Sequence, residues 1–98
     1  MDYTIHRTEN YIKWFDRLKD KTTKVRILAR LHRAEGGNFG DFNPLTDNLC
    51  ELKFTFGGGI RIYYTVKETQ IILLLNGGDK SSQVKDIKKA KQLLTELE

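Results

Sequence analysis

The segment LCELKFTFGGGIRIYYTVKETQIILLL, residues 49–75, contains the pattern that decides the fold. Apolar and polar residues alternate over residues 49–56 and again over residues 60–66, which is the period of a half-buried β-strand. Three consecutive glycines separate these two runs and predict a β-hairpin. A turn at residues 67–69 leads to a third strand, residues 70–75, whose continuous apolar character is typical of a central strand.

Other elements are predicted on both sides of this segment. Residues 2–6 alternate as an opening strand does, and Thr8 can cap a helix whose apolar face holds Tyr11, Trp14, Phe15 and Leu18. A second helix ends at the Gly36-Gly37 pair, with an apolar stripe of Val25, Ile27, Leu28, Leu31 and Ala34. Residues 36–48 hold the only proline and no usable period, so a connecting loop is predicted there.

A last helix is predicted over residues 82–97. Its expected buried positions are Val84, Ile87, Leu94 and Leu97, and its exposed lysines are Lys85, Lys88, Lys89 and Lys91. The predicted order is β-α-α-β-β-β-α, an α+β protein with a mostly antiparallel four-stranded sheet and helices packed against it.

Length, charge and cysteine content narrow the class of protein. The 98 residues predict one domain, 1–98, and the net charge of +4 favours polyanionic partners such as RNA, DNA or an acidic protein. Cys50 is the only cysteine, so neither an internal disulfide nor a zinc site made of thiolates is expected. The longest apolar run has five residues and the amino end lacks an apolar signal core, so we expect a cytosolic location.

Strand alternation places four polar side chains on one face of the predicted hairpin: Glu51, Lys53, Arg61 and Tyr63. If the helices cover the opposite face, which carries Ile60 and Ile62, these four side chains gather on an open surface. Two cations beside an aromatic ring suit a phosphate and an unstacked base. A cross-strand charge ladder with no ligand explains the same pattern.

The stretch LLLNGGDKSSQ, residues 73–83, also has two interpretations. Its glycines permit a tight turn, and Asp79, Ser81 or Ser82 can cap the following helix. Alternatively, the helix start binds an anion and Lys80 supplies the counter-charge. The glycine spacing is unlike a nucleotide-binding P-loop, which argues against an ATPase.

Other candidate sites are less specific. Arg26, Arg30 and Arg33 form a basic ridge on the second predicted helix, either a solvated face or a surface for ribosomal RNA or an acidic partner. His6 and His32 lack carboxylate or cysteine neighbours at ligand spacing, so no metal site is expected. No cofactor is expected either.

Three motifs together carry a family resemblance: E-L-K before the hairpin turn, G-x-R-I-Y-Y after it, and L-L-x-G-G-D-K-S-S-Q-x-x-D-I at the end of the sheet. In this order they resemble the phage-associated addiction-module killer proteins, a HigB-like branch of the RelE/ParE toxin superfamily. The resemblance implies a RelE-like fold and a toxin that a cognate helix-turn-helix antitoxin inactivates. Ribonucleolytic members enter the ribosomal A site and cut the translated mRNA without a metal.

The resemblance also implies roles for particular residues. Arg61 matches the strand arginine that contacts the scissile phosphate, Lys53 a basic position on the preceding strand, and Lys80 roughly the cation after the last strand. We therefore expect catalytic roles for these three residues, with proton transfer by Lys53 or Lys80. RNA-binding roles are expected for Tyr63, Lys85, Arg26 and Arg30.

Two departures of this sequence from the RelE pattern leave alternatives open for its residue roles and its function. Leu49 and Glu51 occupy strand positions that are lysines in the best-understood RelE proteins, and Asp86 falls about where those proteins have a tyrosine. Tyr63 could stack on a base in its place, and Asp79 or Asp86 could order the cations. A non-catalytic inhibitor, such as a gyrase poison, and an inactive module that only binds nucleic acid or antitoxin remain alternatives to the endoribonuclease.

Overall fold

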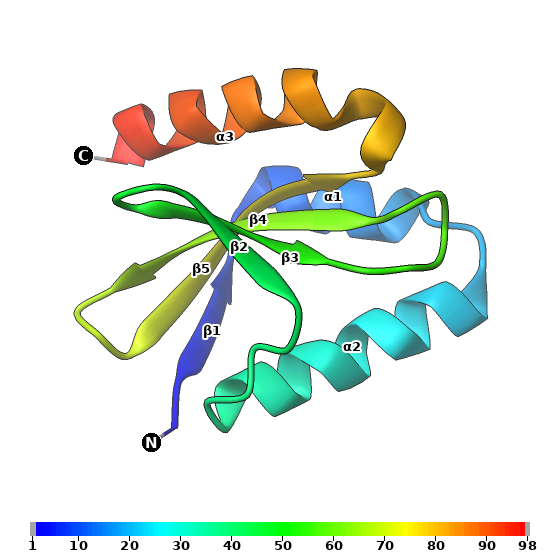
Figure 1. Ribbon diagram of the computed structural model, residues 1–98, viewed down its shortest axis with the longest axis horizontal. Coiled ribbons are helices and arrows are strands. Elements are labelled where there is room, and N and C mark those ends of the chain that lie inside the picture. Colours follow the sequence, from blue (N-terminus) through cyan, green and yellow to red (C-terminus); the bar gives the residue numbers. More distant parts are fainter. Residues whose placement is uncertain (1, 98) are drawn as a thin grey trace.

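The computed structural model describes residues 2–97 and shows a five-stranded sheet with helices on both faces (Figure 1). The strands are β1 (Thr4–Arg7), β2 (Phe42–Thr46), β3 (Leu49–Lys53), β4 (Arg61–Lys67) and β5 (Ile71–Gly78). The helices are α1 (Glu9–Arg17), α2 (Lys21–Glu35) and α3 (Gln83–Leu97), and a 3-10 turn, η1 (Lys80–Ser82), precedes α3. The predicted α+β class is confirmed.

The sheet has the order β1-β5-β4-β3-β2. β1 and β5 pair in parallel and the other neighbours are antiparallel, so the sheet is mostly antiparallel, as predicted. β5 is an interior strand with β1 on one side and β4 on the other, which agrees with its apolar sequence. The register of the β3–β4 hairpin sets Lys53 opposite Arg61 and Glu51 opposite Tyr63.

The prediction of four strands is wrong, because the expected loop contains the edge strand β2. β2 pairs with β3 on one side only, and its register shifts between Pro44 and Thr46. An edge strand tolerates proline because one side of its backbone makes no ladder hydrogen bonds. The proline and the irregular register remove the alternation that would reveal this strand.

Local signals account for the helix and hairpin boundaries. The Thr8 hydroxyl accepts a hydrogen bond from the Tyr11 amide at 3.1 Å, and Asp20 caps α2 through the Thr22 amide at 3.0 Å. In the β3–β4 connection, Gly57, Gly58 and Gly59 all have positive φ angles, 61°, 75° and 81°. Such a run of left-handed residues requires glycine.

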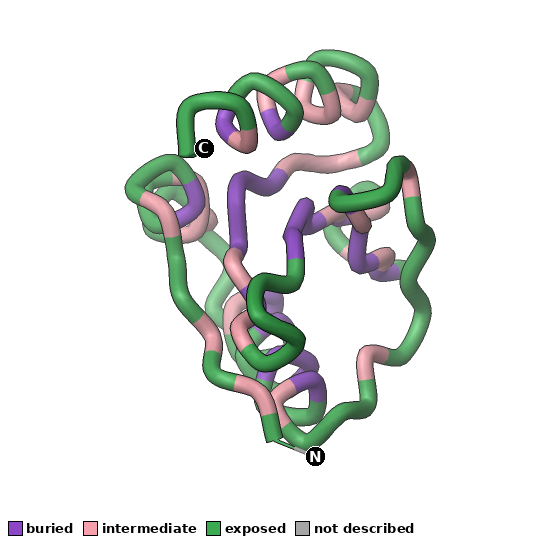
Figure 2. The backbone as a smooth tube through the Cα atoms, turned by 90° about the vertical axis from the view of Figure 1, so that its left-hand side faces the viewer, coloured by how far each residue is buried: buried purple, intermediate pink, exposed green. Residues whose placement is uncertain are grey.

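The two faces of the sheet carry separate cores (Figures 1 and 2). α1 and α2 pack on the face that holds Leu52, Ile62, Tyr64, Ile72 and Leu74. α3 packs on the opposite face, where Ala90 and Leu93 meet Leu49, Tyr63 and Leu75. The expected open face therefore lies beneath α3, and that expectation is wrong.

The helix stripes also differ from the predicted ones. α2 buries Ile27, Leu31 and Ala34 as expected, but Val25 and Leu28 are exposed. On α3 the buried positions are Ala90 and Leu93, while Val84 is 86 % exposed. A periodic pattern indicates a helix, but neighbouring elements select which part of its circumference becomes buried. Within residues 2–97, no helix is long and apolar enough to cross a membrane.

Candidate functional site

The β3–β4 hairpin places two predicted catalytic cations side by side. Lys53 is the last residue of β3 and lies directly opposite Arg61, the first residue of β4. Directly opposed residues of antiparallel strands project to the same face, so both side chains leave the sheet on the α3 side. Both residues are only partly buried, because they lie at the end of the sheet where α3 begins.

Arg61 keeps part of its hydrogen-bonding capacity unused. Its side chain is 13 % exposed, and Nη1 donates to the Gly59 carbonyl at 3.1 Å. Its Nε lies 4.0 Å from Glu51 Oε1, too far for a hydrogen bond, and has no hydrogen-bond partner among the described residues. The Nε itself is buried, so the free donor faces Glu51 and not solvent, and an anion would have to approach the guanidinium through its partly exposed end.

Lys80 comes to the same place through the glycine turn. Its amide donates to the Gly58 carbonyl at 3.3 Å, which ties η1 to the β3–β4 connection. A Cβ added to Gly59 would lie 3.3 Å from Lys80 Cβ and 3.5 Å from Arg61 Nη1. The missing side chain at Gly59 therefore lets the 3-10 turn approach the arginine, and Arg61, Lys53 and Lys80 surround one end of the hairpin.

Glu51 is the acidic partner of this cation cluster. Only 2 % of this residue is exposed, and its two carboxylate oxygens accept from Gln83 Nε2 at 3.4 and 3.2 Å. A buried carboxylate needs a nearby cation and hydrogen-bond donors to offset its desolvation. Arg61 and Gln83 supply them, so Glu51 orients the arginine instead of binding RNA. The pairing of Glu51 with Gln83, across 32 residues, carried no signal in the sequence.

The expectation that Tyr63 stacks on a base is wrong in this structure. Tyr63 is fully buried under α3, and its hydroxyl has no hydrogen-bond partner within residues 2–97. Burial raises the pKa of Tyr63 well above its usual value, and the negative charges of Glu51 and Asp86 raise this pKa further. A neutral, covered phenol has no access to a nucleobase.

Arg30 does not belong to a free basic ridge either. Its guanidinium donates to the carbonyls of Phe39 at 3.0 Å, Lys53 at 3.0 Å and Asp41 at 2.6 Å. It also lies over the Phe54 ring, 4.7 Å from the centroid, and burial lowers its pKa. Arg30 is therefore a structural residue that holds β2 and β3 to α2, which corrects its predicted RNA-binding role.

The remaining predicted RNA-binding residues lie away from Arg61. Arg26 is exposed on α2, on the other face of the sheet, with its guanidinium 5.1 Å from the centroid of the Phe56 ring. Lys85 is exposed on α3 and lines a groove between α3 and α1. The hairpin site therefore contains Arg61, Lys53 and Lys80 but neither of these residues.

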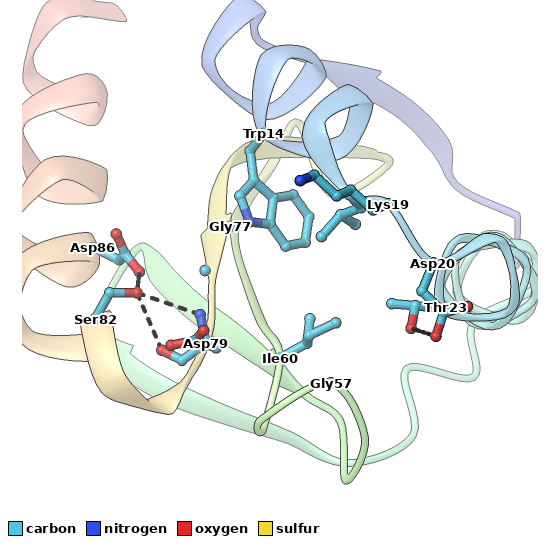
Figure 3. Close-up of a pocket in the computed structure, with 12 residues that line it drawn as sticks. Trp14, Lys19, Asp20, Thr23, Gly57, Ile60, Gly77, Asp79, Ser82 and Asp86 are labelled. Carbon is cyan, nitrogen blue, oxygen red and sulfur yellow. Dashed lines mark hydrogen bonds between the residues drawn. The ribbon is translucent and has the colours of Figure 1, made fainter.

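The glycine pair at the end of β5 brings α1 and α3 close to the strand. A Cβ on Gly77 would overlap the Trp14 ring at 2.5 Å, and a Cβ on Gly78 would overlap the Asp86 carboxylate. Asp86 accepts from the Ser82 hydroxyl at 2.5 Å, on the wall of a cavity of about 540 Å³ (Figure 3).

Asp79 is the expected cap of the segment after β5. Its carboxylate accepts from the Ser81 hydroxyl and amide at 2.5 and 2.9 Å, and these bonds lower the pKa of Asp79. Capping therefore accounts for Asp79 and the serines, while the anion-binding interpretation applies only to Lys80.

Comparisons with known proteins agree with this fold. Residues 13–95 match the family described as phage derived protein Gp49-like (DUF891). An uncharacterized protein of Haemophilus influenzae is 41% identical over 97 residues, which cover 99% of this chain and 98% of that protein.

Two solved structures share the architecture. A mutant of the E. coli toxin RelE in the free state has a TM-score of 0.69 and 17% identity, covering 88% of this chain and 93% of RelE. A chain of the intact E. coli RelBE toxin-antitoxin complex has a TM-score of 0.61 and 16% identity, covering 79% of this chain and 95% of that chain. At such identities the likeness shows the RelE-like fold alone, whereas the family match covers most of the sequence: the chain belongs to the Gp49-like family of phage-derived proteins.

Proposed function

We propose that this protein is the toxin of a type II toxin-antitoxin pair and acts as a ribosome-dependent mRNA endoribonuclease. The observation that carries the proposal is that Arg61, Lys53 and Lys80 come together at one end of the β3–β4 hairpin, where the Arg61 Nε has no hydrogen-bond partner among the described residues. The RelE-like fold supports it, because the similar solved structures are of a toxin and of a toxin-antitoxin complex. We also place the protein in a HigB-like branch, with a helix-turn-helix antitoxin and a cytoplasmic site of action.

Metal-independent RNA cleavage assigns a distinct task to each cation. The 2′-oxygen attacks the adjacent phosphorus as a base takes its proton, and the bond to the 5′-oxygen breaks as an acid protonates that oxygen. The products are a 2′,3′-cyclic phosphate and a 5′-hydroxyl. A guanidinium is not suited to act as the base, but the paired donors of Arg61 suit the charge on the phosphorane oxygens.

Lys53 and Lys80 are the proposed proton-transfer residues. They flank Arg61 from β3 and from η1, so one could face the 2′-oxygen while the other faces the 5′-oxygen. Glu51 then acts as a positioning residue, since its buried carboxylate lies 4.0 Å from the Arg61 Nε, and Gln83 holds that carboxylate in place.

Dependence on the ribosome follows from the weakness of this acid–base set. Holding the mRNA with the 2′-oxygen in line with the scissile bond can supply several kcal/mol, about 7–11 at best. A site with one charge stabiliser and two lysines gains from that orientation, because it lacks a strong acid–base pair to drive the reaction on free RNA.

The decisive experiment maps transcript 5′ ends after induction of the toxin in growing cells. Wild-type protein should produce new 5′-hydroxyl ends within translated codons and arrest growth. Arg61→Ala should abolish both effects, whereas Arg33→Ala, at an exposed arginine of α2, should retain them. Arg61→Lys keeps the charge beside Glu51 but loses the planar fork, so it should still lose most cleavage while remaining folded. Cutting that persists in both Arg61 variants would contradict the proposal.

A second function is favoured by one observation. Tyr63 is buried and Arg61 is largely covered, which suits an inhibitor that uses its surface rather than a catalytic site. A gyrase poison of the ParE type would arrest growth with transcripts intact and block supercoiling by purified gyrase. Normal supercoiling in excess protein would eliminate this alternative, and harmless overexpression without antitoxin would instead indicate an inactive binding module.

A further inference from the structure

α1 and α3 present matching polar faces to each other across the end of β5. On α1 the facing residues are Asn10, Lys13, Trp14 and Arg17, and on α3 they are Lys85, Lys88, Lys89 and Gln92. Each set follows the spacing i, i+3, i+4, i+7, which is one face of a helix. Together they enclose a groove of about 640 Å³, called here the α1–α3 groove.

The charge of the α1–α3 groove is strongly unbalanced. Five cations line it, Lys13, Arg17, Lys85, Lys88 and Lys89, against one carboxylate, Asp86, which already accepts from Ser82. Within residues 2–97, the only ion pair formed by these five is an exposed one between Lys13 and Glu9 at 3.2 Å. Lysines three and four residues apart on α3 repel one another. A polyanion would remove that repulsion.

The floor of the groove carries polar and aromatic groups as well. Asn76 lies there with 6 % of its surface exposed; its Nδ2 donates to the Asp86 carbonyl at 3.0 Å, and its Oδ1 has no partner in the described structure. Trp14, the only tryptophan of the chain, lines the groove beside Gly77. Figure 3 shows the ring of Trp14 next to Gly77.

The strand edge below the groove is also open. Pairing between β1 and β5 ends at Arg7 and Leu74, and the Thr8 amide then bonds to the Leu74 carbonyl at 3.0 Å. Asn76 and Gly77 line the groove, and no strand of the described chain pairs with them on that side. The site is therefore assembled from α1 and from the end of β5 and α3, which lie far from α1 in the sequence.

We infer that the α1–α3 groove binds the backbone of single-stranded nucleic acid, as an anchoring site apart from Arg61. Two rows of cations suit consecutive phosphates, an indole suits stacking of a base, and the amides of Asn10 and Gln92 suit base edges. This set of groups favours a nucleic acid over an acidic peptide, which would use the cations but neither the indole nor the amide pattern. The inference depends on the proposed function only in taking RNA as the natural polymer.

The test measures binding of a short oligodeoxyuridylate to the full chain, with the fluorescence of Trp14 as the signal. The deoxy strand lacks the 2′-hydroxyl and cannot be cleaved by the proposed chemistry, so binding is measured apart from catalysis. The variant Lys85→Glu with Lys88→Glu reverses two exposed groove charges. Its matched control is Lys67→Glu with Lys91→Glu, which changes net charge equally at two exposed lysines outside the groove.

The expected results separate a site from general attraction. The wild-type protein should bind with quenching of Trp14. The groove variant should lose about tenfold or more in affinity, and the slope of log K against log salt should fall by about 1.4, two phosphates at about 0.7 each. The control should lose about threefold or less.

Equal losses of affinity for the oligonucleotide in the two double variants would overturn the inference. Binding without a change in Trp14 fluorescence would also overturn it. Tighter binding of a polyglutamate peptide that competes with the oligonucleotide would also overturn it, because the groove would then be a protein-binding surface. Failure of the proposed function looks different: the oligonucleotide binds in the groove while transcripts stay intact in cells. Cleavage that depends on Arg61 but is unaffected by Lys85→Glu with Lys88→Glu would reject the role of the groove and leave the proposed function standing.

Discussion

The two faces of the sheet use the same strands for different purposes. The face beneath α1 and α2 carries a large apolar core, with Ile27, Leu31, Ile62, Ile72 and Leu74 all buried. The face beneath α3 has a smaller core and mixes it with buried polar groups, among them Glu51, Asn76 and the Arg61 guanidinium. The first face stabilises the fold, and the second holds polar groups that a purely structural layer would not need.

Two arginines show the same contrast. Arg30 directs its guanidinium at three backbone carbonyls, whereas Arg61 has one firm hydrogen bond and an Nε without a partner in the described structure. Saturated donors indicate a structural residue, whereas a buried donor without a partner indicates a placement that packing alone does not explain.

The largest effect is expected when a buried leucine is truncated in each of the two cores. Leu74→Ala should lower the free energy of unfolding by about 3–5 kcal/mol, because Leu74 is fully buried on the larger face. Leu93→Ala should lose less, about 2–3 kcal/mol, because Leu93 lies at the margin of the smaller cluster. Urea unfolding of both variants measures the difference. Equal losses of unfolding free energy would contradict the conclusion that the larger core contributes more to stability.

The next comparison applies one conservative change to each arginine. Arg30→Lys should lower the free energy of unfolding by about 2–3 kcal/mol, since an ammonium cannot reach all three carbonyls. Arg61→Lys keeps a cation beside Glu51 and should lose about 1 kcal/mol or less. A reversed order in chemical denaturation would show that Arg61, not Arg30, is the structural residue.

Alkaline pH provides a third comparison. Burial raises the pKa values of Tyr11 and Tyr64 on the larger face and of Tyr63 on the smaller one. Each folded-state pKa lies above the unfolded value near 10, so stability is complete below about pH 10 and falls above it. Each tyrosine should contribute a slope of about −1.4 kcal/mol per pH unit there, which unfolding curves recorded above pH 10 would measure. An unfolding free energy that stays constant above pH 10 would contradict the burial of these phenols.

The smallest expected effect removes one hydroxyl from each face. The Tyr63 hydroxyl has no partner among residues 2–97, so Tyr63→Phe should change stability by about 1 kcal/mol or less and in the stabilising direction. The same variant should make the alkaline slope shallower by about 1.4 kcal/mol per pH unit. Tyr64 lies directly opposite Cys50, whose thiol interacts with its hydroxyl, so Tyr64→Phe should lose about 0.5–1.5 kcal/mol in thermal unfolding. Destabilisation by Tyr63→Phe alone would reveal a partner for its hydroxyl.

Much of the fold was predictable from local signals. The period of two, the triple glycine and the caps at Thr8 and Asp79 define the hairpin, the central strand and the starts of α1 and η1. The edge strand β2 was missed, because Pro44 and a register shift erase its alternation. Val84 was assigned to the core of α3 but is exposed, because helical period does not by itself select the buried face.

The candidate site was predictable only in part. Alternation places Lys53 and Arg61 on one face, and the structure brings Lys80 to them through Gly59. The roles of Arg30 and Tyr63 were assigned incorrectly, since each depends on segments far away in the chain that cover or bind the side chain. The α1–α3 groove had no sequence signal, because its two helical faces are about 70 residues apart.

The sequence by itself determined which residues form strands, where the hairpin turns and which side chains share a face, because these follow from backbone sterics and from the two-residue period of a strand. Only the tertiary structure decided which face each helix covers, which arginine keeps free donors and which lysines meet across a groove. Those outcomes depend on the packing of distant segments, whose free energies are set by contacts and burial rather than by local propensity.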